Sequence, residues 1–156
     1  AREIDRGGNL TGMSCMKERS FLDTNILIYT DDNSAPEKQA LAIELLQSGW
    51  SDGNVILSTQ VLQEYFSAAT RKMGIPVETA QRKIELLGKR IDIFSIEHQD
   101  ILQAIDLHRL HSFSFWDSLI VRMAQKSACA ILYSEDMQHD RMINGVRIVN
   151  PFYALG

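Results

Sequence analysis

Residues 20–29 read SFLDTNILIY, which places one acidic residue between two apolar runs. We interpret the first run as a short strand from about Ser20 to Asp23, and the second as the start of an apolar helix. A carboxylate at such a junction loses hydration, and this costs free energy unless another group compensates. Asp23 is therefore a candidate functional residue.

Strand and helix patterns alternate along the rest of the chain. This alternation is typical of a parallel sheet covered by helices, and it predicts the α/β class. Gly49 stands where the first long helix is expected to end. The strands are predicted at about 20–23, 55–57, 91–96, 130–133 and 146–149, and the helices at about 36–49, 59–69, 77–87, 98–110 and 116–126.

The overall composition restricts the class of protein. The 156 residues are 45% hydrophobic and include 16 basic and 20 acidic side chains. No apolar run approaches the roughly 20 residues that span a bilayer, so no membrane association is expected. Two distant cysteines, Cys15 and Cys129, suggest neither a disulfide framework nor a zinc site, which favours a reduced cytoplasmic location. We expect one domain over residues 16–156, behind a disordered leader at 1–15 that is foreign to the natural sequence.

Four acidic residues fall where predicted strands end or where the next helices begin. They are Asp23, Glu64, Asp117 and Asp136. Ligands of open α/β sheets bind outside the carboxyl ends of the strands, so these side chains are candidates for one shared site. Each also has a structural interpretation when taken alone, as a helix cap, a turn residue or a solvated helix residue. Together they predict an acidic pocket.

Carboxylates held close together raise one another's pKa, and a bound divalent cation removes this conflict. Ligation by oxygen alone favours Mg²⁺ or Mn²⁺ over zinc. Such an ion can activate a water molecule and hold a phosphate oxygen. Without these four acids the charges balance at 16 basic and 16 acidic residues. Basic pairs such as Arg71-Lys72, Arg82-Lys83 and Lys89-Arg90 could then meet a polyanion.

The sequence resembles the PIN-domain nucleases, and among them the toxin ribonucleases of VapC type. The resemblance extends over essentially residues 16–152. Its motifs are Leu22-Asp23-Thr24-Asn25, Gln63-Glu64-Tyr65, Phe115-Trp116-Asp117-Ser118, Tyr133-Ser134-Glu135-Asp136-Met137-Gln138 and Ile148-Val149-Asn150-Pro151-Phe152.

This resemblance implies a Rossmann-like α/β/α sandwich with a mostly parallel sheet of four to five strands. It also implies a Mg²⁺- or Mn²⁺-dependent endoribonuclease toxin that forms a homodimer and is neutralised by an antitoxin inserted into the active site. The implied site residues are Asp23, Glu64, Asp117 and Asp136 as metal-binding acids, with Thr24, Asn25 and Ser134 in support.

One position departs from the pattern of this family. Where relatives often have glycine after the Gln-His pair, this chain has Asp140. Asp140 is either an additional acid near the site or a loop residue.

Three alternatives compete with the nuclease. A PIN fold with weak or no catalysis would serve as a binding module for RNA or protein. A phosphoaspartyl phosphatase needs a second acid two residues after the first, where this chain has Asn25. A phospho-acceptor receiver domain needs a lysine after its last main strand, and Ser134-Glu135-Asp136 contains none.

Overall fold

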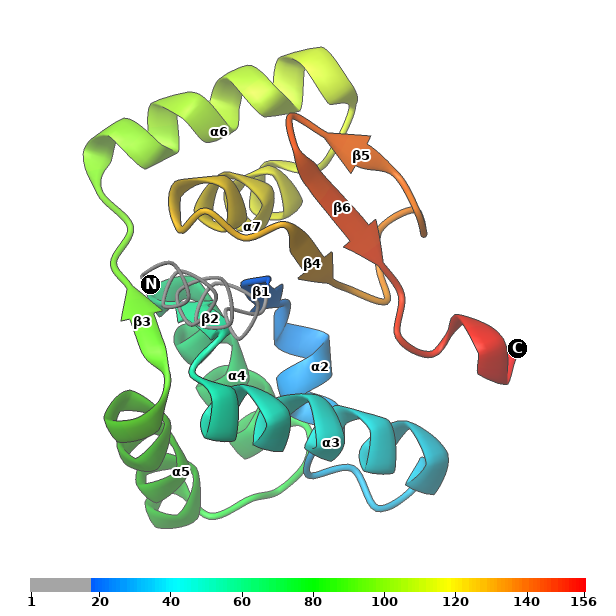
Figure 1. Ribbon diagram of the computed structural model, residues 1–156. Coiled ribbons are helices and arrows are strands. Elements are labelled where there is room, and N and C mark those ends of the chain that lie inside the picture. Colours follow the sequence, from blue (N-terminus) through cyan, green and yellow to red (C-terminus); the bar gives the residue numbers. More distant parts are fainter. Residues whose placement is uncertain (1–17) are drawn as a thin grey trace, which may run out of the picture.

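A computed structural model describes residues 18–156, so the predicted leader at 1–15 lies outside the described residues. The centre of the fold is a six-stranded sheet in the order β3-β2-β1-β4-β6-β5 (Figure 1). All neighbouring strands are parallel except β5 and β6, which confirms the predicted sheet type. The strands are β1 (Ser20–Leu22), β2 (Val55–Ser58), β3 (Asp92–Phe94), β4 (Ile131–Tyr133), β5 (Met142–Ile143) and β6 (Val146–Val149).

Helices lie on both sides of the sheet. In Figure 1, α6 and α7 lie on one side and α3 on the other, and α7 contacts β2, β4 and β6. No helix within residues 18–156 is both long and apolar enough to cross a membrane. The helices are α2 (Thr24–Tyr29), α3 (Pro36–Asp52), α4 (Thr59–Arg71), α5 (Val77–Arg90), α6 (His98–His111) and α7 (Phe115–Lys126), followed by the short 3₁₀ helix η1 (Tyr153–Leu155).

Strand β1 lies in the middle of the core. Phe21 and Leu22 are fully buried, and β1 pairs with β2 on one side and β4 on the other. The N–H of Asp23 donates to the carbonyl of Tyr133 at 2.9 Å, which extends the pairing with β4 by one residue. Helix α2 begins at the next residue. The apolar run therefore fixes the backbone of Asp23 at the carboxyl edge of the sheet.

The predicted end of the first long helix at Gly49 is wrong. Helix α3 continues to Asp52, and the left-handed residue Gly53 (φ 69°) follows it. Gly49 lies where α3 approaches β2, because a Cβ atom at this position would lie 2.0 Å from Cγ2 of Val55. The glycine therefore permits close packing of helix on strand.

Replacement of Gly49 by Ala is expected to destabilise the fold by about 1–3 kcal/mol, the usual cost of overpacking a core. The control is Gly88→Ala in α5, where a new Cβ would meet no atom within 4 Å. Gly88→Ala should stabilise the protein by about 0.5–1 kcal/mol, because alanine favours helix over glycine. Urea unfolding of both variants measures the difference. Equal stability of the two variants would contradict the close packing of Gly49 against Val55.

Candidate functional site

The site begins where the adjacent strands β1 and β4 end. Asp23 follows β1 and Ser134 follows β4, and both side chains are buried. The Asp23 carboxylate accepts two hydrogen bonds, one from the N–H of Thr24 and one from the hydroxyl of Ser134, each at 2.7 Å. Asp23 is also the N-cap of α2. These contacts hold the carboxylate in one orientation.

Burial raises the pKa of Asp23 from 3.8 to about 7. The hydrogen bonds from Ser134 and Thr24 oppose this rise, and the negative charges of Asp117 and Asp136 add to it. Near neutral pH this carboxylate therefore binds a proton readily, and a cation at the same place would compete with that proton.

Glu64 extends toward the same edge from α4. Its carboxylate accepts from the Thr24 hydroxyl at 2.5 Å and from the side-chain amide of Gln60 at 3.1 Å. The Gln60 amide also donates to the carbonyl of Trp116 at 3.3 Å, so it links α4 to the first turn of α7. Sequence reasoning missed Gln60. Its position four residues before Glu64, on the same helix face, was the available signal.

Asp136 is held by Asn25. The Asn25 amide nitrogen donates to the Asp136 carboxylate at 2.8 Å, and the Asn25 oxygen accepts from the N–H of Glu135 at 3.4 Å. The N–H of Asp136 donates to the Ser134 hydroxyl at 3.2 Å. Ser134 therefore contacts both Asp23 and Asp136. Thr24 and Asn25 each donate a side-chain hydrogen bond to one of the predicted acids.

Asp117 belongs to the first turn of α7. The helix is capped by Ser114, whose hydroxyl accepts from the N–H of Asp117 at 3.0 Å. Burial raises the pKa of the Asp117 carboxyl, the charges of Asp136 and Glu64 raise it further, and the contact with Ser114 opposes the rise. Electrostatic coupling therefore connects all four acids.

The chemistry of these donors suits a hard divalent cation. The four acids offer only oxygen atoms. The pKa values of Asp23 and Asp117 are raised, first by burial and then by neighbouring acids, and a bound cation would stabilise their charged forms. No three acidic, histidine or cysteine side chains within residues 18–156 already form a compact ligand set.

Within residues 18–156, no hydrogen bond or ion pair joins the Asp140 side chain to these acids. Its carboxylate pairs with Arg147 at 2.6 Å, and more than half of its side chain is exposed. Its backbone has φ 71°, in the left-handed region that glycine adopts most easily. A glycine at this position, as in the similar family, would fit the backbone without strain.

Two hollows flank the segment Ser134–Asp136. One, of about 600 Å³, is lined by Thr24, Asn25, Ile28, Glu64, Ser67, Ala68, Arg71, Lys72 and Asp136, and we call it the α4 cleft.

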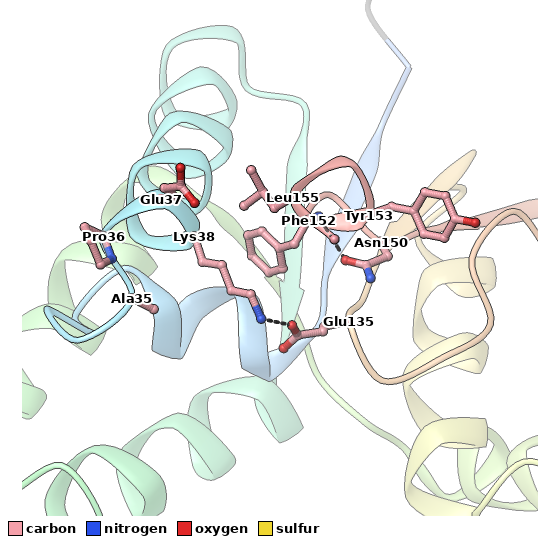
Figure 2. Close-up of a pocket in the computed structure, with 10 residues that line it drawn as sticks. Ala35, Pro36, Glu37, Lys38, Glu135, Asn150, Phe152, Tyr153 and Leu155 are labelled. Carbon is pink, nitrogen blue, oxygen red and sulfur yellow. Dashed lines mark hydrogen bonds and ion pairs between the residues drawn. The ribbon is translucent and has the colours of Figure 1, made fainter.

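The other hollow, of about 790 Å³, includes Lys38, Glu135 and Phe152 (Figure 2). There Glu135 pairs with Lys38 and accepts from the Tyr29 hydroxyl at 2.7 Å. Glu135 and Asp136 therefore line different hollows, and the contacts of Glu135 bind this segment to α2 and α3. Sequence reasoning missed this pair, because Lys38 belongs to no motif and lies 97 residues before Glu135 in the chain.

Comparison with known proteins identifies the family of this fold. The PIN domain model matches residues 20–144, and the chain belongs to the PIN domain family. A comparison with curated protein sequences finds no match.

Solved structures share the fold. DNA-bound VapBC from Salmonella typhimurium is similar with a TM-score of 0.61 and 19% identity, over 85% of this chain and 97% of that one. A toxin–antitoxin complex from Klebsiella pneumoniae gives 0.59 and 20%, over 85% and 97%. VapC20 of Mycobacterium tuberculosis, a sarcin–ricin loop cleaving toxin, gives 0.58 and 20%, over 75% and 89%. At these identities the likeness concerns the fold.

Proposed function

We propose that this protein is a Mg²⁺- or Mn²⁺-dependent endoribonuclease, and that it acts as the toxin of a toxin–antitoxin pair. The observation that carries the proposal is the coupled set Asp23, Glu64, Asp117 and Asp136 at the carboxyl edge of a PIN-domain sheet. The structural neighbours support it, since one is an RNA-cleaving toxin and others are toxin–antitoxin complexes.

In this proposal Asp23, Asp117 and Asp136 hold the cation, and Glu64 completes the site. A bound cation would supply Lewis acidity and lower the pKa of a coordinated water. The other residues orient the acids. Ser134 and the N–H of Thr24 orient Asp23, Asn25 orients Asp136, and the Thr24 hydroxyl and Gln60 orient Glu64.

The proposal extends to partners. We expect a cytoplasmic homodimer and a cognate antitoxin that inserts a segment among the four acids, as the resemblance to VapC-type toxins implies. The RNA strand is expected to enter the same space, so antitoxin and substrate compete. This competition explains neutralisation without any change in the fold.

Removal of metal tests the proposed reaction. Purified protein is expected to cut RNA in Mn²⁺ or Mg²⁺, leaving 5′-phosphate and 3′-hydroxyl ends, and to stop cutting in EDTA. Activity should return when metal is restored, because the acids keep their positions through protein contacts. End-labelled RNA on denaturing gels measures the cleavage. Binding of RNA without cleavage in either metal would instead favour the binding-module alternative.

A further inference from the structure

The α4 cleft contains charges of both signs. Glu64 and Arg71 are seven residues apart on α4, which is about two helical turns, or roughly 10 Å along the axis. Ser67 and Ala68 lie between them and also line the cleft. Residues at this spacing share one face of a helix. One face of α4 therefore leads from the metal-binding acids to a pair of cations, Arg71 and Lys72.

Arg71 and Lys72 are exposed, and neither pairs with a carboxylate within the part of the chain that the structure describes. Several other basic side chains are neutralised by acids of the fold, although some exposed ones, such as Arg82 and Lys89 of α5, also pair with no carboxylate within residues 18–156. Examples of such pairs are Lys38–Glu135, Lys83–Asp31, Arg122–Asp100, Lys126–Asp100 and Arg147–Asp140. The two cations in the cleft are therefore available to an external anion.

We propose that Arg71 and Lys72 bind a phosphate of the RNA strand beside the phosphate that is cut. This inference rests on the proposed function. The acids alone repel a polyanion, so the strand needs cations close to them in order to stay bound. An arginine can donate two parallel hydrogen bonds to one phosphate, and the neighbouring lysine adds a second charge. The face of α4 then sets the direction of the strand across the site.

The order of charges favours RNA over an acidic protein segment. A nucleic-acid strand carries a regular series of phosphates, so one can lie at the acids with their cation while a neighbour lies at Arg71 and Lys72. An acidic peptide bound at these two cations would instead place further carboxylates against Glu64 and Asp136, which line the same cleft. Repulsion between like charges would disfavour that arrangement.

The test compares two double variants with the same change in charge. Arg71→Gln/Lys72→Gln removes the two cations of the cleft. Arg82→Gln/Lys89→Gln removes two exposed cations of α5 that do not line it. Binding of a short single-stranded RNA is measured by fluorescence anisotropy in EDTA, so that no strand is cut, over a range of KCl concentrations.

The cleft variant is expected to bind the RNA roughly fivefold more weakly than the wild type at about 0.1 M salt, as the loss of one phosphate contact implies. Its log–log salt slope should be shallower by about 0.7, because the two cations contact one phosphate and each phosphate contact on a single strand contributes about 0.7. The α5 variant should keep a slope close to the wild-type value. In cleavage assays with Mn²⁺ the cleft variant should show a raised KM and a kcat close to the wild-type value, because these cations bind the strand away from the acids.

Equal binding by the two variants would overturn the assignment of Arg71 and Lys72, even if the wild type cuts RNA. If RNA binding depends on Arg71 and Lys72 but the wild-type protein never cuts RNA, the result would support the assignment of these two residues and contradict the proposed nuclease activity. Weakened binding of poly(glutamate), together with unchanged RNA binding, would overturn it in favour of an acidic protein partner. Circular dichroism checks that both variants keep their helices.

Discussion

Replacement of Asp23 by Asn is expected to reduce metal-dependent RNA cleavage by about 100-fold or more, since even groups that only support a metal ligand typically contribute 10- to 100-fold. The amide keeps the shape of the side chain. Its oxygen can accept from the N–H of Thr24, and its nitrogen can donate to the Ser134 hydroxyl. The variant should therefore fold and lose only the charge. Initial rates of cleavage in Mn²⁺ measure the effect.

Asp140→Asn is the matched control. It removes one negative charge from a residue whose role the resemblance to the family left undecided. In the structure this residue pairs with Arg147. We expect its cleavage rate to stay within about twofold of the wild type, because exposed ion pairs contribute little. Full activity in the Asp23 variant would contradict the proposed site, and a large loss in the Asp140 variant would bring Asp140 into it.

The metal-free protein is expected to lose stability as the pH rises from 5 to 8. Burial raises the pKa of Asp23 from 3.8 to about 7, so between these values the folded chain holds a proton that the unfolded chain has released. The free energy of unfolding then falls with pH, by about 2 kcal/mol between pH 5 and pH 7 from this group. The raised pKa of Asp117 acts in the same direction. Urea unfolding in EDTA at several pH values measures the change.

Asp23→Asn removes this carboxyl from the titration, together with the charge by which it acts on Asp117 and Asp136. The variant should show a flatter pH profile and should be more stable than the wild type at pH 8. Added Mn²⁺ should stabilise the wild type at pH 8 and the variant much less, because a ligand stabilises the state that binds it. Identical pH profiles for the two proteins would show that burial does not perturb Asp23 as inferred.

Much of the fold could be predicted, because apolar runs indicate the buried strands and helical periodicity indicates the helices. The carboxyl-edge position of Asp23 followed from the apolar residues on both sides of it. Strand β5 was missed, because Met142–Ile143 is only two residues long and exists through pairing with β6. Gly49 was assigned to a helix end, because a glycine needed for close packing looks the same in sequence as one that ends a helix.

The candidate site was predictable to the extent that its residues belong to motifs. Thr24, Asn25 and Ser134 were expected beside the acids, and the structure gives each a hydrogen bond to one of them. Gln60 and the pair Lys38–Glu135 act through contacts between residues far apart in the chain. Such contacts depend on how the helices pack, and this packing cannot be derived from a single sequence.

The direct pairing of Asp23 with β4 divides the site into a fixed and an adjustable part. The Asp23 backbone continues the hydrogen bonding of two central strands, so its position can change only if the core opens. The carboxylates of Glu64 and Asp136 are oriented only by side-chain contacts, from Thr24 and Gln60 and from Asn25, and they can shift without disturbing the sheet. Glu64 and Asp136 would thus adjust to a cation of different radius or to an RNA strand of different shape, while Asp23 keeps its position.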